Sequence, residues 1–101
     1  MTDGLHVIFG TGPVGLAVMQ ELTGRGEQVR MVNHSGHADL PPGVDLVSGD
    51  AADPEFAVAA AAGATVVYQA LNPPYDKWVE QFPGLQSSVM GAARTNGAVL
   101  V

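Results

Sequence analysis

The stretch that decides the fold is HVIFGTGPVG, residues 6–15. It carries Gly10, Gly12 and Gly15 in the spacing G-x-G-x-x-G. In a chain that wraps a pyrophosphate, the first glycine permits a tight turn and the second lets the backbone approach the phosphates. The third lets a helix pack close to a strand. Because glycines are common, the motif predicts a dinucleotide site only if a strand precedes it and a helix follows it.

The flanking sequence meets both conditions. Residues 5–9 are a short apolar run with β-branched side chains, typical of a strand buried on both faces. Residues 13–22 then carry apolar side chains at helical spacing, and we expect Val14, Val18 and Leu22 to face the core. The alternative interpretation is a glycine turn with only a structural role.

The rest of the chain alternates between the two kinds of element. Further strands are predicted over residues 28–33, 44–47, 64–71 and 98–101, and helices over residues 53–63 and 75–96, the last divided in two by Pro83. Such alternation implies right-handed βαβ units and a parallel sheet. We therefore predict an α/β fold with a Rossmann-like doubly wound parallel sheet of about five strands, order 3-2-1-4-5, truncated after strand 5. Residues 1–101 form one dinucleotide-binding domain in this prediction.

Composition and charge exclude several classes. The chain has 101 residues, 47% of them hydrophobic and 14% charged, which is typical of one globular domain. Its net charge of −6 disfavours nucleic acid as a partner, whereas backbone N–H groups can hold a single pyrophosphate. No cysteine is present, which excludes disulfides and thiolate metal sites. Residues 1–4 lack the basic charge of a signal peptide, and the most apolar window, residues 56–71, is too short for a bilayer. We expect a cytoplasmic protein with no membrane partner.

The second strand ends at Asn33, followed by His34 and Ser35. Ligands of parallel sheets lie at the carboxyl ends of the strands, and an acid at this end binds the adenosine ribose of NAD. These three residues present no carboxylate to a 2′-phosphate, and each can donate a hydrogen bond. We therefore expect NADP or NAD as the cofactor, with NADP mildly favoured. The alternative is that these are ordinary solvated loop residues.

The third and fourth strands supply the remaining candidates. Asp50 is expected to meet adenine, which needs an acceptor, or else to be a turn residue bonded to its own backbone. We assign Asp53 to helix capping. After the fourth strand, the small Ala70 leaves room for the nicotinamide ribose. Asn72 is expected either to bond that ribose or a substrate, or only to end the strand.

Together these segments resemble the N-terminal Rossmann half of atypical and extended short-chain dehydrogenases, the NAD-dependent epimerase/dehydratase group. The segments that carry the resemblance are VIFGTGPVG (7–15), VNHSG (32–36), GDAAD (49–53) and NPPY (72–75). The resemblance covers essentially the whole chain but only the first half of such an enzyme. It implies cofactor contacts at Gly10, Thr11, Gly12, Pro13, Val14, Gly15, Asn33, His34, Ser35, Asp50, Ala51, Ala70, Leu71 and Asn72.

The family's catalytic pair, Y-x-x-x-K, is not found in these residues. Neither Tyr68 nor Tyr75 has a lysine four residues on, and the one lysine is Lys77. Hydride transfer needs an acid or base poised at the substrate carbonyl. We therefore expect the NAD(P)-binding portion of a short-chain dehydrogenase-like oxidoreductase or epimerase, catalytically incomplete alone, with no catalytic residues and no metal of its own.

Two other functions stay open. One is a regulatory nucleotide-binding domain resembling those of potassium-transport regulators, which share the glycine loop and a Gly-Asp-Ala-x-Asp step. Those domains usually keep an acid where this chain has Asn33, so that residue favours the dehydrogenase kinship. The other is an α/β assembly unit that binds no nucleotide. Residues 98–101 would form an apolar strand at the sheet edge, so we expect self-association through it or a neighbouring helix face.

Overall fold

The computed structural model describes residues 4–71 and 78–101, except for the side chains of residues 78–82. Its elements, in chain order, are β1 (Leu5–Phe9), α1 (Pro13–Gly24), β2 (Gln28–Asn33), β3 (Asp45–Ser48), α2 (Pro54–Ala60), β4 (Ala64–Gln69), α3 (Trp78–Thr95) and β5 (Val99–Leu100). The strands form one parallel sheet in the order β3-β2-β1-β4-β5, which confirms the predicted fold and strand order. The strand ends differ from the predicted ones by no more than a few residues, as is usual for such boundaries.

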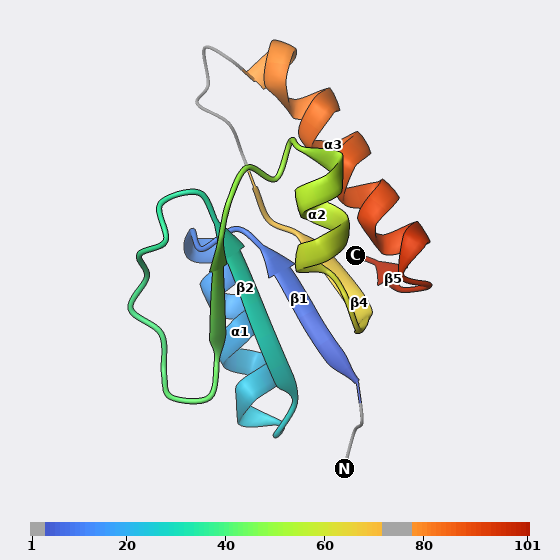
Figure 1. Ribbon diagram of the computed structural model, residues 1–101. Helices are drawn as coiled ribbons and strands as arrows, with labels where there is room; N and C mark the ends of the chain where they lie inside the picture. Colours follow the sequence, from blue (N-terminus) through green and yellow to red (C-terminus); the bar gives the residue numbers. More distant parts are fainter. Residues whose placement is uncertain (1–3, 72–77) are drawn as a thin grey trace.

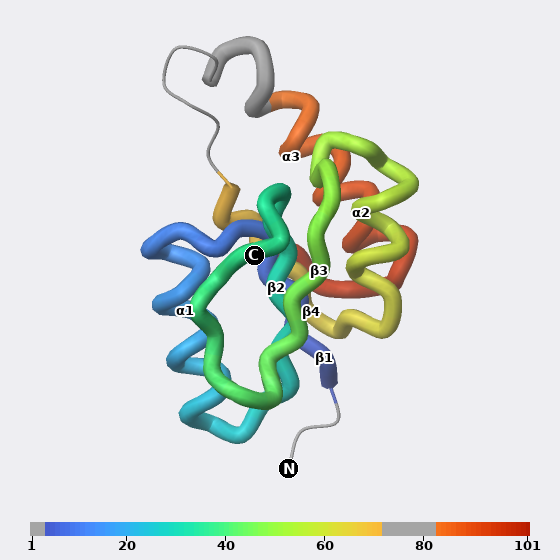
Figure 2. The backbone as a smooth tube through the Cα atoms, turned by 60° about the vertical axis from the view of Figure 1, so that its left-hand side comes forward, coloured from blue at the N-terminus to red at the C-terminus, as the bar shows by residue number. Residues whose placement is uncertain are grey.

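Helices cover both faces of the sheet (Figure 1). Helix α1 lies on one face, and α2 and α3 pack against each other on the opposite face. The loop between β2 and β3 runs on the α1 side, as Figure 2 shows, and its Leu40 and Val44 pack against the apolar cluster there. None of the helices in the described part of the chain is long and apolar enough to cross a membrane.

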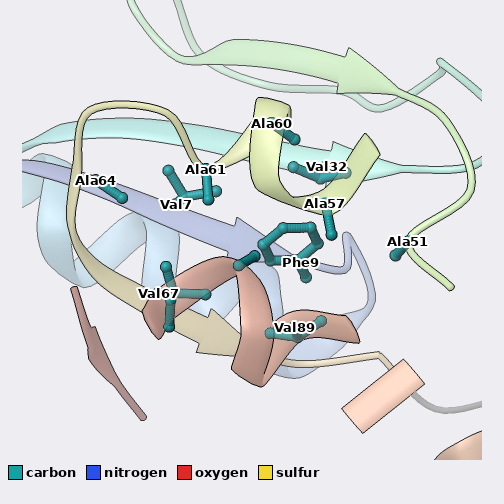
Figure 3. Packing of buried hydrophobic residues seen from close by; sticks show 12 residues of the cluster. Val7, Phe9, Val32, Ala51, Ala57, Ala60, Ala61, Ala64, Val67 and Val89 are labelled. Carbon is teal, nitrogen blue, oxygen red and sulfur yellow. The ribbon is translucent and has the colours of Figure 1, made fainter. Parts of the chain in front are cut away.

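The central strand β1 joins two apolar clusters, because its side chains alternate between the two faces of the sheet. Phe9 is fully buried and lies between Ala57 of α2 and Val89 of α3 (Figure 3). Ile8 points to the other face, where it packs in one cluster with Met19 of α1. Ile8 and Phe9 are therefore buried on opposite faces of the sheet, as expected for a strand covered on both faces.

The expected inner face of α1 was wrong at Val14, a residue that is 64% exposed. The buried residues of this helix are Gly15, Met19 and Leu22. Apolar residues occur on more than one side of α1, so their spacing alone does not choose a face. The close packing of Gly15 against the loop before the helix makes the choice, and it turns Val14 outward.

The expected break at Pro83 was also wrong, because α3 runs through this residue as one helix. Pro83 lies in the second turn, where a missing N–H removes a single intrahelical hydrogen bond. The carboxyl-terminal half of the helix buries Val89, Ala92 and Ala93 in the cluster that it shares with α2 and β4. This packing offsets the lost bond, and the helix continues to Thr95.

Candidate functional site

Four strands end level with one another at the edge of the sheet that lies uppermost in Figure 1. Phe9 pairs with Val32 of β2 and with Gln69 of β4, and Asn33 pairs with Ser48 of β3. The segments that follow β1, β2, β3 and β4 therefore meet at this edge, and nearly all the predicted site residues lie in them.

The fold itself requires two of the three glycines in the loop after β1. Gly10 has φ +121°, and a Cβ on it would lie 2.7 Å from the carbonyl oxygen of Ala70. Positive φ of this kind is rare for residues with side chains. A Cβ on Gly15 would collide with the carbonyl oxygen of Gly10, closer than real contacts allow. Gly10 permits the turn, and Gly15 lets α1 pack close to the loop.

Gly12 differs from the other two. Its φ of −76° and ψ of −172° are open to any residue. A Cβ built on it would meet no atom of the described chain within 4 Å. The packing of the chain therefore gives no reason for a glycine at this position. A small residue here keeps a space open that the protein's own described atoms do not fill.

That space adjoins the amino end of α1. Gly12 caps this helix without a side-chain hydrogen bond, and the intrahelical bond to its carbonyl comes from the N–H of Leu16, at 2.9 Å. The first-turn N–H groups of Val14 and Gly15 precede that bond and have no intrahelical acceptor. A cleft of about 290 Å³ opens beside them, lined by Gly10, Thr11, Gly12, Pro13, Val14, Ala70 and Leu71. Free N–H groups and the positive end of the helix dipole favour an anion in this cleft.

Asn33, at the end of β2, is buried with 8% of its surface exposed. Its Nδ2 donates to Oγ1 of Thr11 at 3.0 Å and to the carbonyl oxygen of His37 at 2.9 Å. Its Oδ1 accepts from the N–H of Gly36 at 2.8 Å. The side chain thus joins the glycine loop to the loop after β2.

His34 and Ser35 are exposed beside this buried amide. The hydroxyl of Ser35 accepts from the N–H of His37 at 3.2 Å and donates to the carbonyl oxygen of the same residue at 3.3 Å. Among the residues that the structure describes, the imidazole of His34 has no hydrogen-bond partner. Of the three side chains at the end of β2, it is the one whose hydrogen-bonding atoms are not engaged with the described chain.

The residues after β3 divide between surface and core. Asp50 is exposed, and its Oδ1 accepts from the N–H of Ala52 at 2.9 Å, which is the turn interaction that the sequence left open. Ala51 is 8% exposed and packs in the cluster around Phe9, so its side chain belongs to the core. Asp53 caps α2 as expected, by accepting from the N–H of Glu55 at 3.1 Å.

At the end of β4, Ala70 and Leu71 line the same cleft as the glycine loop. Asn72 and the rest of NPPY lie outside the described residues. Gln69 is a residue that the sequence did not single out. Its Oε1 accepts from the N–H of Leu71 at 2.7 Å, while its Nε2 is buried with no partner in the described chain. A polar residue at the end of an apolar strand was the available signal.

Within the described residues, no cluster of His, Asp and Glu has the geometry to hold a metal ion.

Solved structures share this fold at low sequence identity, and 143 chains match. A Rossmann-fold NAD(P)-binding family protein from Shigella flexneri is 18% identical with a TM-score of 0.79, over 98% of this chain and 50% of that one. The Bordetella bronchiseptica enzyme WbmG, in complex with NAD and UDP, is 19% identical with a TM-score of 0.79, over 96% and 36% of the two chains. Uronate dehydrogenase from Agrobacterium tumefaciens is 21% identical with a TM-score of 0.72, over 93% and 37%.

The chain thus spans half or less of the length of each of these proteins. Comparison with curated protein sequences found no match. A family profile described as NAD(P)H-binding matches residues 10–99. This range includes the glycine loop, the strands β2, β3 and β4, and the first residue of β5. The match covers most of the sequence, and the chain therefore belongs to the NAD(P)H-binding family.

Proposed function

We propose that the chain holds the pyrophosphate of NAD(P) in the cleft beside α1, on the backbone N–H groups of the glycine loop and of the first helical turn. The observation that carries this proposal is the open space at Gly12, which the chain's packing does not explain. A phosphate group needs that space, because a Cβ would keep it from the backbone. Membership of the NAD(P)H-binding family supplies the ligand class.

The other predicted site residues take their roles from this placement. We propose that Asn33, His34 and Ser35 lie on the side of the adenosine ribose, and that the carboxylate of Asp50 and the backbone of Ala51 lie near adenine. Ala70, Leu71 and Asn72 then lie on the nicotinamide side. NADP is favoured over NAD because the end of β2 holds no carboxylate to repel a 2′-phosphate.

We propose further that the chain alone carries no complete reaction of the dehydrogenase or epimerase type. These 101 residues contain no Y-x-x-x-K pair. The proton donor or acceptor that such a reaction needs would then come from residues outside them.

Self-association is proposed at the β5 edge of the sheet. Among the described residues, Val101 binds only the backbone of β4, by accepting from Gln69 N–H at 3.2 Å and donating to Val67 O at 2.8 Å. The side chains of Val99 and Val101 are exposed, and β5 is the last strand of the sheet. An open apolar edge pairs readily with another strand. Sedimentation at monomer mass across micromolar concentrations would contradict this. The cytoplasmic location stays a prediction.

Isothermal titration calorimetry with separate ligands tests the cofactor proposal. We expect NADPH and NADH to bind with one site per chain, and nicotinamide mononucleotide, which lacks the pyrophosphate, to bind at least about tenfold more weakly. If a chain that melts cooperatively shows no heat with either dinucleotide, the proposal is wrong. A preference for ATP would favour the regulatory nucleotide-binding domain instead.

A further inference from the structure

The α1 face of the sheet is only partly covered in the described chain. On this face α1 and the loop of residues 34–44 pack against β1, β2 and β3, whereas α2 and α3 lie on the opposite face (Figure 1). Strand β4 meets only the flank of α1 there, and no described helix covers β5 from that side. Sheets in which all strands are parallel are almost always covered on both faces.

The side chains on this bare half of the face are apolar. Val67 packs in the cluster with α2 and α3, so its neighbours Val66 and Tyr68 point to the α1 face. Val99 pairs with Val66 and points the same way, as does Val101 two residues later. Val99 and Val101 are 64% and 68% exposed, so this half of the sheet offers an apolar surface to solvent.

A groove of about 350 Å³ lies between α1 and β4 on the same face. Its lining residues are Ala17, Val18, Glu21, Leu22, Arg25 and Tyr68. The hydroxyl of Tyr68 is bonded to Nδ1 of His6 at 2.9 Å, so the polar end of this side chain already has a partner. Arg25 donates to Oε1 of Glu21 at 2.8 Å, and both side chains are exposed. The groove is therefore apolar, with one ion pair at its rim.

We propose that a second copy of this chain covers the groove and the bare half of the face, in a two-fold dimer formed by α1, β4 and β5. This contact adjoins the β5 edge but differs from strand pairing there. Strand pairing uses the backbone of β5 and leaves the side chains of Val99 and Val101 exposed, because they stand perpendicular to the sheet. The inference does not depend on the proposed cofactor site.

The distribution of charge favours contact between copies at this place. Five exposed acids lie on β3 or in the segments beside it, namely Asp39, Asp45, Asp50, Asp53 and Glu55. Strand β3 is at the opposite end of the sheet from β5. The net charge of −6 opposes any contact that brings these acids together. Two copies that meet through β4 and β5 keep them far apart.

The ion pair at the rim is complementary to a second copy of itself. A two-fold axis brings the same patch of both chains together. Glu21 and Arg25 are one helical turn apart, so two α1 helices that cross in opposite directions at this turn place Glu21 of each copy near Arg25 of the other. The two pairs then form one network of alternating charge.

A charge-swap experiment tests this arrangement by sedimentation equilibrium. Glu21→Arg and Arg25→Glu, each alone, should weaken dimerisation at least about tenfold, because the network then holds charges of one sign. An equimolar mixture of the two variants should dimerise as the wild type does, because each chain supplies the charge that the other lacks.

A second pair of variants separates the face from the β5 edge. Ala17 is exposed on α1 and lines the groove, so Ala17→Glu should weaken dimerisation at least about tenfold by placing a charge in the apolar contact. Gln20→Glu is the matched control, because Gln20 is exposed on the same helix and does not line the groove. It should dimerise as the wild type does.

Each result decides between the two contacts. A wild type that stays at monomer mass overturns the inference. If Ala17→Glu associates as tightly as Gln20→Glu, the inference is wrong and strand pairing at β5 joins the copies. If Ala17→Glu abolishes association, the face joins them and the β5 edge does not. A mixture of charge-swapped chains that stays monomeric while the wild type associates overturns the two-fold arrangement. Failure of NADPH to bind would end the cofactor proposal and leave these results unchanged.

Discussion

Gly12→Ala should separate cofactor binding from folding. In the folded chain the new Cβ would meet no described atom within 4 Å, and the backbone angles at this position suit alanine. Loss of backbone freedom in the unfolded state favours alanine by about 0.4–1 kcal/mol. Alanine is a poorer helix cap than glycine, which offsets that gain by about 0.5–1 kcal/mol. The two effects nearly cancel, so we expect the free energy of unfolding to change by less than about 0.5 kcal/mol.

The effect on binding should be far larger. The Cβ would occupy the space beside the first-turn N–H groups of α1, and a phosphate oxygen could no longer reach all of them. A hydrogen bond from a backbone N–H to a charged oxygen contributes about 1.5–3 kcal/mol. Loss of one such bond raises the dissociation constant for NADPH and NADH by about 10- to 100-fold.

Urea denaturation and calorimetric titration of the same samples measure the two effects together. Gly24→Ala is the matched control, because Gly24 is the last residue of the same helix and a Cβ there also meets no atom within 4 Å. Its binding constant should equal that of the wild type. If Gly12→Ala binds both dinucleotides as tightly as Gly24→Ala does, the open space at Gly12 is not a phosphate site.

Three further outcomes are expected. Gly15→Ala should destabilise the chain by about 1–3 kcal/mol in urea denaturation, because its Cβ meets a backbone oxygen that cannot rotate away; wild-type stability would count against the packing of α1. Asp53→Ala should lower the free energy of unfolding by about 1 kcal/mol in the same assay, because it removes the side-chain cap of α2. An unchanged midpoint of urea denaturation would refute the capping role. Burial and the charge of Glu27 raise the pKa of Tyr68 above 10.0, partly opposed by Arg25. The Tyr68 hydroxyl therefore stays protonated to higher pH in the folded chain than in the unfolded chain. The free energy of unfolding should fall as pH rises through the folded pKa, and Tyr68→Phe should reduce that fall. An equal loss of stability at alkaline pH in the wild type and in Tyr68→Phe would contradict the raised pKa.

The sheet could be predicted from sequence because its signals are local. Apolar runs bounded by glycine and proline marked each strand, and the alternation of strands with helices predicted parallel pairing. The strand order followed from the doubly wound fold that the glycine loop indicates. The two errors, at Val14 and Pro83, arose where a tertiary contact decides. Which side of α1 is buried depends on the approach of Gly15 to Gly10, which the helical spacing does not contain.

The candidate site was predicted less completely. Family membership confirms the predicted NAD(P) cofactor, while the choice between NAD and NADP and the role of each residue stay predictions. The sequence placed Asn33 and Ala51 at the correct strand ends. It could not show that the amide of Asn33 is taken up by the carbonyl of His37, or that Ala51 turns into the core. Both outcomes depend on the path of a loop, and residue type does not determine that path.

The most direct test of the central claim follows the backbone amide resonances of isotopically labelled chain by NMR during titration with NADPH. The account predicts saturable shifts concentrated at Gly12, Val14 and Gly15, with the far end of α1 at Gly24 unaffected. Shifts that do not saturate, or a saturable response that leaves these three amides unchanged, would contradict it.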